Sequence, residues 1–261
     1  MKQSKRIFTV IVSFIALAIL ALGIFLYIKS TKISIFQQTA SVSASESAPS
    51  VSRISITSST AVQTTAEINP NEDLLLLVNY NHPVPEAYKT KLVSTEFNQK
   101  IDSRAANDLK QLLNACRKAG CKPLPCSGYR SKKEQAKLLS QKVLEYKNRG
   151  FSAKEAQKQA RKWIAEPGKS EHHTGLAMDI IDLDYQILDE KQKNTKTQRW
   201  LMKHCWEYGF ILRYPEEKKA ITHINSESWH YRYVGKENAK KIYQSGLCLE
   251  EYVQKMQAFK N

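Results

Sequence analysis

The stretch SEHHTGLAMD, residues 170–179, decides how the chain folds around its most reactive side chains. Two histidines precede Gly175, and an apolar run at residues 176–181 follows it. The glycine predicts a turn, and the apolar run predicts a buried strand. Alternate residues of a strand share one face, so Asp179 can point back towards the loop that carries His172. The stretch therefore predicts an imidazole and a carboxylate that lie close together.

A second stretch, ESWH at residues 227–230, adds an imidazole and a carboxylate from a separate element. His172, Asp179 and His230 together would give a zinc ion three ligands and leave its fourth position open for water, which is typical of catalytic zinc sites. Glu227 lies three residues before His230 and could accept a proton from that water. Taken singly, each residue also has a structural explanation, because histidines and strand aspartates often serve only the fold.

The surrounding sequence mixes helical periodicity with short apolar runs. Ser131 and Glu134 form a capping-box pattern, which predicts the start of a helix. Because helices come first and strands cluster in the second half, we predict a single α+β domain with a small, mostly antiparallel sheet flanked by helices. We expect helices at residues 103–118, 131–146, 152–165, 197–208, 237–243 and 249–258, and strands at 124–126, 176–181, 210–214 and 229–234.

Residues 7–28 form a run of 22 residues without a charge, preceded by Lys2, Lys5 and Arg6. At about 1.5 Å per residue, a helix of this length spans the roughly 30 Å hydrocarbon layer of a bilayer. We predict a transmembrane anchor at 7–28 behind a cytoplasmic stub at 1–6. A cleaved signal peptide is the alternative and would give a secreted protein, although its apolar core is usually only about 7–15 residues long.

A segment rich in serine and threonine follows the predicted anchor. Between residues 41 and 65, 13 of 25 residues are Ser or Thr, without helical or strand periodicity. This composition is typical of a disordered spacer, so we assign residues 29–68 to a linker and 69–261 to the folded domain. The topology predicts a single-pass protein of the cell membrane with its folded domain outside the cytoplasm, which excludes nucleic acid as the ordinary partner.

The chain is strongly basic, with a formal net charge of +15 and a pI near 9.5. Such a balance favours an anionic partner, which can be nucleic acid, anionic lipid or an anionic polymer. Residues 131–170 hold 11 Lys or Arg against 4 Glu, a net charge of +7. These charges are either ordinary solvated helix faces or a surface that attracts a polyanion.

The five cysteines do not form an obvious framework. Cys116, Cys121 and Cys126 lie in a C-x4-C-x4-C run, and Cys205 and Cys248 stand far downstream. The odd number leaves at least one thiol unpaired in a monomer, and the spacing does not match the C-x2-C pairs of zinc sites. One structural disulfide and a set of buried, unpaired cysteines are equal alternatives.

Four stretches of the chain form an ordered set of motifs: LVN at 77–79 with HPVP at 82–85; SGYRS at 127–131 with Gln135; S-x-H-x-x-G-x-A-x-D at 170–179; and GFILRYP at 209–215 followed by E-x-W-H-x-RYVG at 227–235. With these motifs, the chain from about Leu75 to Tyr252 resembles the VanY-type zinc D,D-carboxypeptidases, which are relatives of the VanX D-Ala-D-Ala dipeptidases. The family usually has Glu-Pro-Trp-His where this chain has ESWH, so Ser228 replaces a proline, and neither a ligand nor the base is lost.

By this resemblance, one Zn²⁺ ion binds to His172, Asp179 and His230, and Glu227 activates the water. The planar guanidinium of Arg130 would hold the terminal carboxylate of the substrate. The same pocket would be lined by Gln135, Ser170 and Tyr214.

Several of these residues have competing interpretations. Arg130 could form a surface salt bridge, Gln135 could be a solvated helix residue, and Tyr214 could be a core aromatic. Three further histidines are predicted to be structural rather than zinc ligands: His173, His204 and His223.

The resemblance implies a hydrolase that removes the C-terminal D-Ala from peptidoglycan stem peptides. Two alternatives stay open: an L,D-carboxypeptidase that acts on tetrapeptide stems, and a catalytically silent peptidoglycan-binding module. The positive charge at residues 131–170 adds anionic wall polymers as candidate partners.

Overall fold

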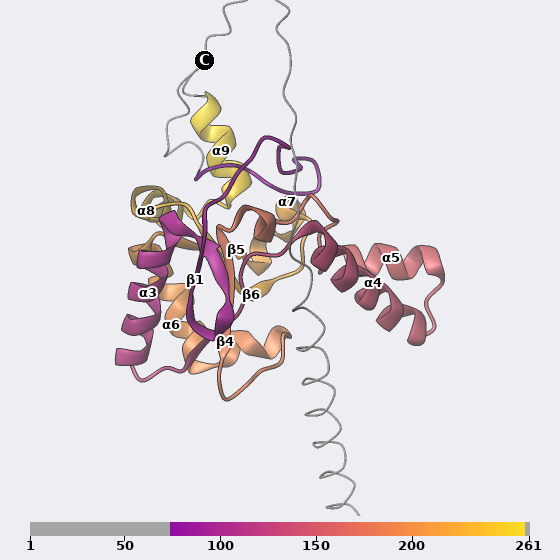
Figure 1. The fold of residues 1–261 in the computed structure, drawn as a ribbon, viewed down its shortest axis with the longest axis horizontal. Helices are drawn as coiled ribbons and strands as arrows, with labels where there is room; N and C mark the ends of the chain where they lie inside the picture. The colour runs from indigo at the N-terminus through magenta and orange to yellow at the C-terminus, as the bar shows by residue number, and fades with distance from the viewer. Residues whose placement is uncertain (1–73, 259–261) are drawn as a thin grey trace, which may run out of the picture. The chain divides into compact units, whose positions relative to one another are not determined.

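The structure is a computed structural model that describes residues 74–258 (Figure 1). The predicted cytoplasmic stub, membrane anchor and linker lie outside these residues. Among residues 74–258, no helix is both long enough and apolar enough to cross a membrane. The membrane anchor therefore stays a prediction from the sequence.

A four-stranded antiparallel sheet with the strand order β3-β4-β6-β5 forms the centre of the described part. This arrangement confirms the predicted α+β class with a small antiparallel sheet. The inner strands β4 and β6 are buried along their whole length, so their side chains are held from several sides. The strands are β3 (Pro123–Ser127), β4 (Ala177–Asp182), β5 (Phe210–Tyr214) and β6 (Glu227–Tyr233).

The helices follow most of the predicted periodicity. Ser131 begins one of them with the predicted capping box, in which its hydroxyl accepts from Glu134 N and the Glu134 carboxylate accepts from Ser131 N. The helices are α3 (Ser103–Lys118), α4 (Lys132–Asn148), α5 (Ala153–Arg161), α6 (Lys196–His204), α7 (Lys219–Thr222), α8 (Lys236–Ser245) and α9 (Leu249–Ala258), with 3-10 turns at Glu96–Asn98, Glu171–Thr174, Glu190–Asn194, Cys205–Tyr208 and Glu216–Lys218.

Two helices end earlier than predicted. α5 ends at Arg161 rather than at residue 165, because Trp163 turns inward and donates a hydrogen bond from Nε1 to Tyr146 Oη at 3.0 Å. α6 ends at His204, and the chain continues as a 3-10 turn to residue 208. In both places a tertiary contact or a tighter turn replaces the last helical turn that periodicity alone predicts.

The short elements α7, β1 (Leu92–Ser94) and β2 (Lys100–Asp102) are absent from the sequence prediction. β1 and β2 pair as an antiparallel hairpin. Segments of three or four residues are too short to show periodicity, so their residues carry no signal for a strand or a helix.

Packing on both faces of the sheet fixes which side chains point where. One face packs against α3 and α6, and Met178 and Tyr231 belong to that core. Asp179 and His230 alternate with them along β4 and β6, so they point to the opposite face. There α8 and α9 cover the β5 side of the sheet through Ile211, and the region around Asp179 and His230 forms the functional site.

The cysteines form no disulfide. All five are free, and four of them are buried. Burial raises the pKa of Cys205 to about 12, so its thiol stays protonated at neutral pH. Of the two alternatives that the sequence left open, the structure shows buried and unpaired cysteines.

Candidate metal centre

Two neighbouring strands bring together the carboxylate and one imidazole of the predicted zinc site. In the β4–β6 ladder, Asp179 lies directly opposite His230, so the two side chains share a face of the sheet. His230 Nδ1 lies 3.1 Å from Asp179 Oδ1. Both side chains are buried.

The third predicted ligand comes from the turn Glu171–Thr174, which precedes β4. His172 Nε2 lies 3.4 Å from Asp179 Oδ2. Gly175 ends the turn in the left-handed conformation with φ 71°, and a Cβ there would lie 3.0 Å from the backbone nitrogen of Asp102. Only glycine adopts that conformation without strain. The turn thus places His172 beside Asp179 and brings one ligand atom from each of the three residues within 4.8 Å of one another.

In each histidine ligand, the ring nitrogen that does not face Asp179 contacts a hydrogen-bond acceptor. His172 Nδ1 lies 2.7 Å from the carbonyl oxygen of Gly128, and His230 Nε2 lies 3.1 Å from Glu171 Oε2. Carbonyl and carboxylate oxygens accept hydrogen bonds and do not donate them. In the metal-binding form, the protons therefore sit on His172 Nδ1 and His230 Nε2. The lone pairs of the other two nitrogens then face Asp179, as coordination by imidazole requires.

The residues present fit a metal ion. His172 Nε2 is buried and forms no hydrogen bond with any described residue, which is costly unless another partner satisfies it. Burial lowers the pKa of His172 to about 4, so this imidazole is neutral at neutral pH. Burial alone would raise the pKa of Asp179, but His172 and His230 hold it well below its usual range. Two imidazoles and a carboxylate form a donor set that suits Zn²⁺.

His230 carries a proton that metal binding has to displace. Burial alone would lower its pKa, but Asp179 and Glu171 raise the pKa of His230 to about 9. Zinc binding at neutral pH therefore releases a proton from this site, as it does wherever a protonated group becomes a ligand.

Glu227 borders the three ligand atoms without belonging to their cluster. It begins β6 opposite Tyr214, and its Oε2 lies 3.9 Å from His230 Nδ1. Burial raises the pKa of Glu227 to about 8, and a divalent cation held beside it would lower that pKa. A carboxylate that titrates in this range beside a metal site is placed to act as a general base.

A small pocket opens beside these residues. Gln135 is buried, so its interpretation as a solvated helix residue is wrong; its Nε2 donates to the carbonyl of Ala165 at 2.8 Å. Arg130 Nη2 lies 3.9 Å from Asp179 Oδ2. Gln135 Oε1 and Arg130 Nε are buried without a hydrogen bond to the described residues, which indicates a binding site for a polar group. The pocket is lined by all four residues predicted to bind substrate: Arg130, Gln135, Ser170 and Tyr214.

The other histidines lie apart from the ligand cluster, as predicted. His173 Nδ1 lies 2.6 Å from the carbonyl oxygen of Arg130, and its Nε2 accepts from Gly168 N at 3.0 Å. Both of its ring nitrogens are therefore engaged elsewhere. His204 and His223 are not among the three residues whose ligand atoms converge.

A buried charged cluster, which was not predicted from the sequence, lies behind the ligands. Glu171 Oε1 accepts hydrogen bonds from Arg213 Nε at 2.7 Å and from Arg232 Nη1 at 2.8 Å. All three side chains have no exposed surface. The sequence offered one signal for this cluster, which is that Arg213 and Arg232 lie inside predicted strands. Since arginine is almost never fully buried unless it is paired, both positions require an acidic partner once their strands are buried.

Comparisons with known proteins agree with this geometry. Residues 98–236 match the sequence profile of the VanY family, which is described as D-alanyl-D-alanine carboxypeptidase. A D-alanyl-D-alanine carboxypeptidase of Enterococcus faecalis is 41% identical over 179 residues. The match covers 69% of this chain and 65% of that relative, which is just under two thirds of its length.

Two solved structures show the same fold at similar identity. A mutant of the vancomycin resistance D,D-pentapeptidase VanY in complex with Zn(II) is 41% identical with a TM-score of 0.64, over 69% of this chain and 99% of that chain. The LdcB LD-carboxypeptidase is 35% identical with a TM-score of 0.61, over 70% of this chain and 87% of that chain.

Proposed function

The chain belongs to the VanY family of D-alanyl-D-alanine carboxypeptidases, and on that premise we propose that it removes the C-terminal D-Ala from peptidoglycan stem peptides. One arrangement carries the proposal. Ligand atoms of His172, Asp179 and His230 converge within 4.8 Å, and Glu227 and Arg130 line the pocket beside two of these ligands, His172 and His230. A metal site, a base and a carboxylate-binding group are the three parts that a zinc carboxypeptidase needs.

The three ligands would hold one Zn²⁺ ion, which supplies a Lewis acid that polarises a carbonyl group and activates water at neutral pH. Glu227 accepts a proton from the attacking water and then donates it to the leaving amine. Its Oε2 lies close enough to the ligands, 3.9 Å from His230 Nδ1, to meet a water molecule between them. Burial of these side chains strengthens each electrostatic contact that develops during the reaction.

Arg130 explains why a carboxypeptidase is favoured over an endopeptidase. Its guanidinium lines the pocket, and its Nε is a buried donor without a partner among the described residues. A guanidinium binds a carboxylate through paired hydrogen bonds. A stem peptide with a free C-terminus offers that carboxylate next to the scissile bond, whereas a cross-linked stem does not.

An L,D-carboxypeptidase that shortens tetrapeptide stems is the second candidate. The 35% identity to the LdcB LD-carboxypeptidase favours it. Both reactions use the same metal, base and carboxylate clamp, so they differ only in the residue that precedes the terminal D-Ala. A catalytically silent module is disfavoured, because the ligands and Glu227 are all in place.

Defined stem peptides separate these candidates. We expect the purified protein with zinc to remove one alanine from a pentapeptide stem and to leave a tetrapeptide stem intact, as read by mass spectrometry of the products. Cleavage of the tetrapeptide alone would establish the L,D-activity instead. If both peptides stay intact with zinc bound, the chain is a silent module.

The catalytic domain acts outside the cytoplasm, tethered to the cell membrane by residues 7–28. The support is the 22-residue uncharged run behind Lys2, Lys5 and Arg6, together with the location of peptidoglycan outside the membrane. Protease added to intact protoplasts should remove the domain, and a domain that stays protected would contradict this placement.

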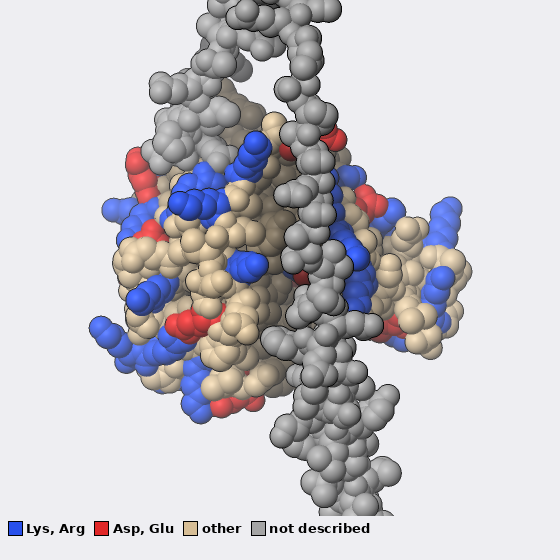
Figure 2. Space-filling model, in the orientation of Figure 1, with Lys and Arg blue, Asp and Glu red and all other residues tan. Residues whose placement is uncertain are grey.

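Anionic wall polymers are proposed partners of the hairpin formed by α4 and α5. These helices pack against each other and stand apart from the sheet, at the right of Figure 1, and Figure 2 shows Lys and Arg side chains along them. Residues 131–170 carry a net charge of +7. Seven lysines of the hairpin form no ion pair with the described part of the chain: Lys132, Lys133, Lys137, Lys147, Lys154, Lys158 and Lys162.

Replacing Lys154, Lys158 and Lys162 of this hairpin by Gln should weaken binding to purified cell walls about tenfold at low ionic strength, because each change removes an attractive charge. A matched variant with Lys110, Lys118 and Lys240 replaced by Gln loses the same charge elsewhere on the surface and should bind nearly as well as the wild type. Cosedimentation with walls, before and after extraction of their anionic polymers, measures the difference. If both variants lose wall binding equally, the total charge of the protein, and not the hairpin, determines the binding.

A further inference from the structure

Glu171 connects the proposed zinc site to two buried arginines. Its Oε2 lies 3.1 Å from His230 Nε2, and its Oε1 accepts from Arg213 Nε at 2.7 Å and Arg232 Nη1 at 2.8 Å. We propose that Glu171 is a positioning residue for zinc: it fixes the ring orientation and the tautomer of His230, while the two arginines hold its carboxylate in place. The inference rests on the zinc site of the proposed function.

Each oxygen of Glu171 has a separate task. Guanidinium groups only donate hydrogen bonds, so the arginines keep Oε1 as an acceptor and compensate its charge. Oε2 accepts from His230 Nε2, which leaves His230 Nδ1 as the nitrogen that faces Asp179. Outer carboxylates of this kind orient zinc-binding histidines in many metal sites. One short turn thus supplies a ligand, His172, and the residue that orients the opposite ligand.

The two arginines are themselves held in place. Arg213 donates from Nη1 and Nη2 to the two carboxylate oxygens of Glu250, at 2.9 and 2.7 Å. Arg232 donates from Nη2 to the carbonyl oxygens of Leu74 and Leu76, at 3.1 and 2.9 Å. Neither guanidinium can rotate without leaving buried donors unpaired, which is unfavourable. The two arginines therefore hold the carboxylate of Glu171 in place through Oε1, while Oε2 contacts His230.

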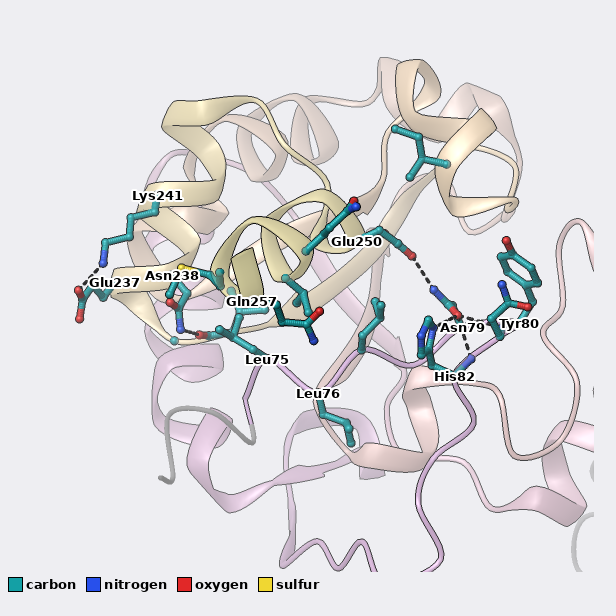
Figure 3. A pocket seen from close by; sticks show the side chains of 18 of the residues that line it. Leu75, Leu76, Asn79, Tyr80, His82, Glu237, Asn238, Lys241, Glu250 and Gln257 are labelled. Atoms are coloured by element: carbon teal, nitrogen blue, oxygen red, sulfur yellow. Dashed lines mark hydrogen bonds and ion pairs between the residues drawn. The ribbon is translucent and has the colours of Figure 1, made fainter. Parts of the chain in front are cut away.

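Glu250 marks the far end of this cluster and offers a matched control. It lines a cavity of about 890 Å³ beside α8 and α9, where its Oε1 accepts from Asn79 Nδ2 at 3.2 Å (Figure 3). Glu250 binds Arg213 as Glu171 does, but it is not among the groups that contact His230. Changing Glu250 therefore weakens the same buried cluster without touching a zinc ligand, while Arg232 still donates to Glu171 Oε1.

Glu171→Gln should disturb the tautomer of His230 rather than the shape of the site. The two arginines can only donate, so the amide oxygen of the new side chain would face them. The amide NH₂ group would then face His230 Nε2, which would have to accept a hydrogen bond. That arrangement places the ring proton on Nδ1, the nitrogen that has to bind zinc.

We expect Glu171→Gln to weaken zinc binding by about 10- to 100-fold, as loss of an outer-shell partner typically does. Competition with a chromophoric chelator, on the full-length protein in detergent, measures the zinc Kd. Glu250→Gln should lower the thermal stability of the zinc-free protein about as much as Glu171→Gln does. It should leave the zinc Kd within about twofold of the wild type. Equal zinc Kd values for the two folded variants would overturn the proposal.

A second measurement needs no variant. In the zinc-loaded wild-type protein with ¹⁵N-labelled histidine, the ring spectra should show the proton of His230 on Nε2 and that of His172 on Nδ1. A proton on Nδ1 of His230 would overturn the proposal even if Glu171→Gln failed to fold. Neither readout depends on turnover, so a chain that binds zinc as expected but cleaves no stem peptide contradicts the proposed function alone.

Discussion

Replacing Glu227 by Gln is expected to lower kcat on a pentapeptide stem by about 10²- to 10⁴-fold while zinc stays bound. Glutamine has nearly the same shape as glutamate, but its amide cannot accept a proton at neutral pH. Glu227 lies 3.9 Å from His230 Nδ1 and is not among the three residues whose ligand atoms converge. Release of D-Ala under single-turnover conditions, together with the zinc content of the same sample, measures both parts of the expectation.

His172→Ala is the comparison that separates a base from a ligand. The change removes Nε2, which lies 3.4 Å from Asp179 Oδ2. Loss of a residue that only hydrogen-bonds to a ligand typically weakens metal binding about 10- to 100-fold, and loss of the ligand itself should weaken zinc binding by more than that. Activity should then fall together with metal content and return in part with excess zinc. A Glu227→Gln protein that holds zinc and still turns over at the wild-type rate would show that another group is the base.

Local patterns predict the turn and the strand that carry His172 and Asp179, but they do not predict how close His230 lies to them. The apolar run after Gly175 predicts a strand, and strand alternation predicts the direction of Asp179. The antiparallel β4–β6 register then sets Asp179 opposite His230. The register itself is not visible in the sequence, so the closeness of these two residues rested on the resemblance to a family.

The buried partners of Glu171 could not be predicted from spacing. Arg213 lies 42 residues and Arg232 lies 61 residues after Glu171, and no periodicity connects residues so far apart. The same limit applies to the end of α5, where the contact of Trp163 with Tyr146 decides the boundary. Sequence patterns report the local chain, whereas these features depend on how distant segments pack.

Replacing Arg130 by Ala should lower kcat/KM for the stem peptide by about 30- to 5,000-fold, which corresponds to the roughly 2–5 kcal/mol lost when one partner of a buried, hydrogen-bonded charge pair is removed. Arg130→Lys should recover only part of this loss, because an ammonium group is a point charge and cannot form the paired hydrogen bonds of a guanidinium. Steady-state release of D-Ala from the two variants and the wild type gives the comparison.

A substrate whose terminal carboxylate is replaced by a carboxamide tests whether Arg130 acts through that group. If it does, replacing the carboxylate by the carboxamide should lower kcat/KM of the wild type about as much as Arg130→Ala lowers kcat/KM for the substrate with the free carboxylate. The Arg130→Ala variant should have nearly equal kcat/KM values for the two substrates. Zinc binding should not weaken in Arg130→Ala, because Arg130 Nη2 lies 3.9 Å from Asp179 Oδ2 and its positive charge opposes a cation there. A variant that loses zinc, or that still prefers the acid as strongly as the wild type does, would place Arg130 in a structural role instead.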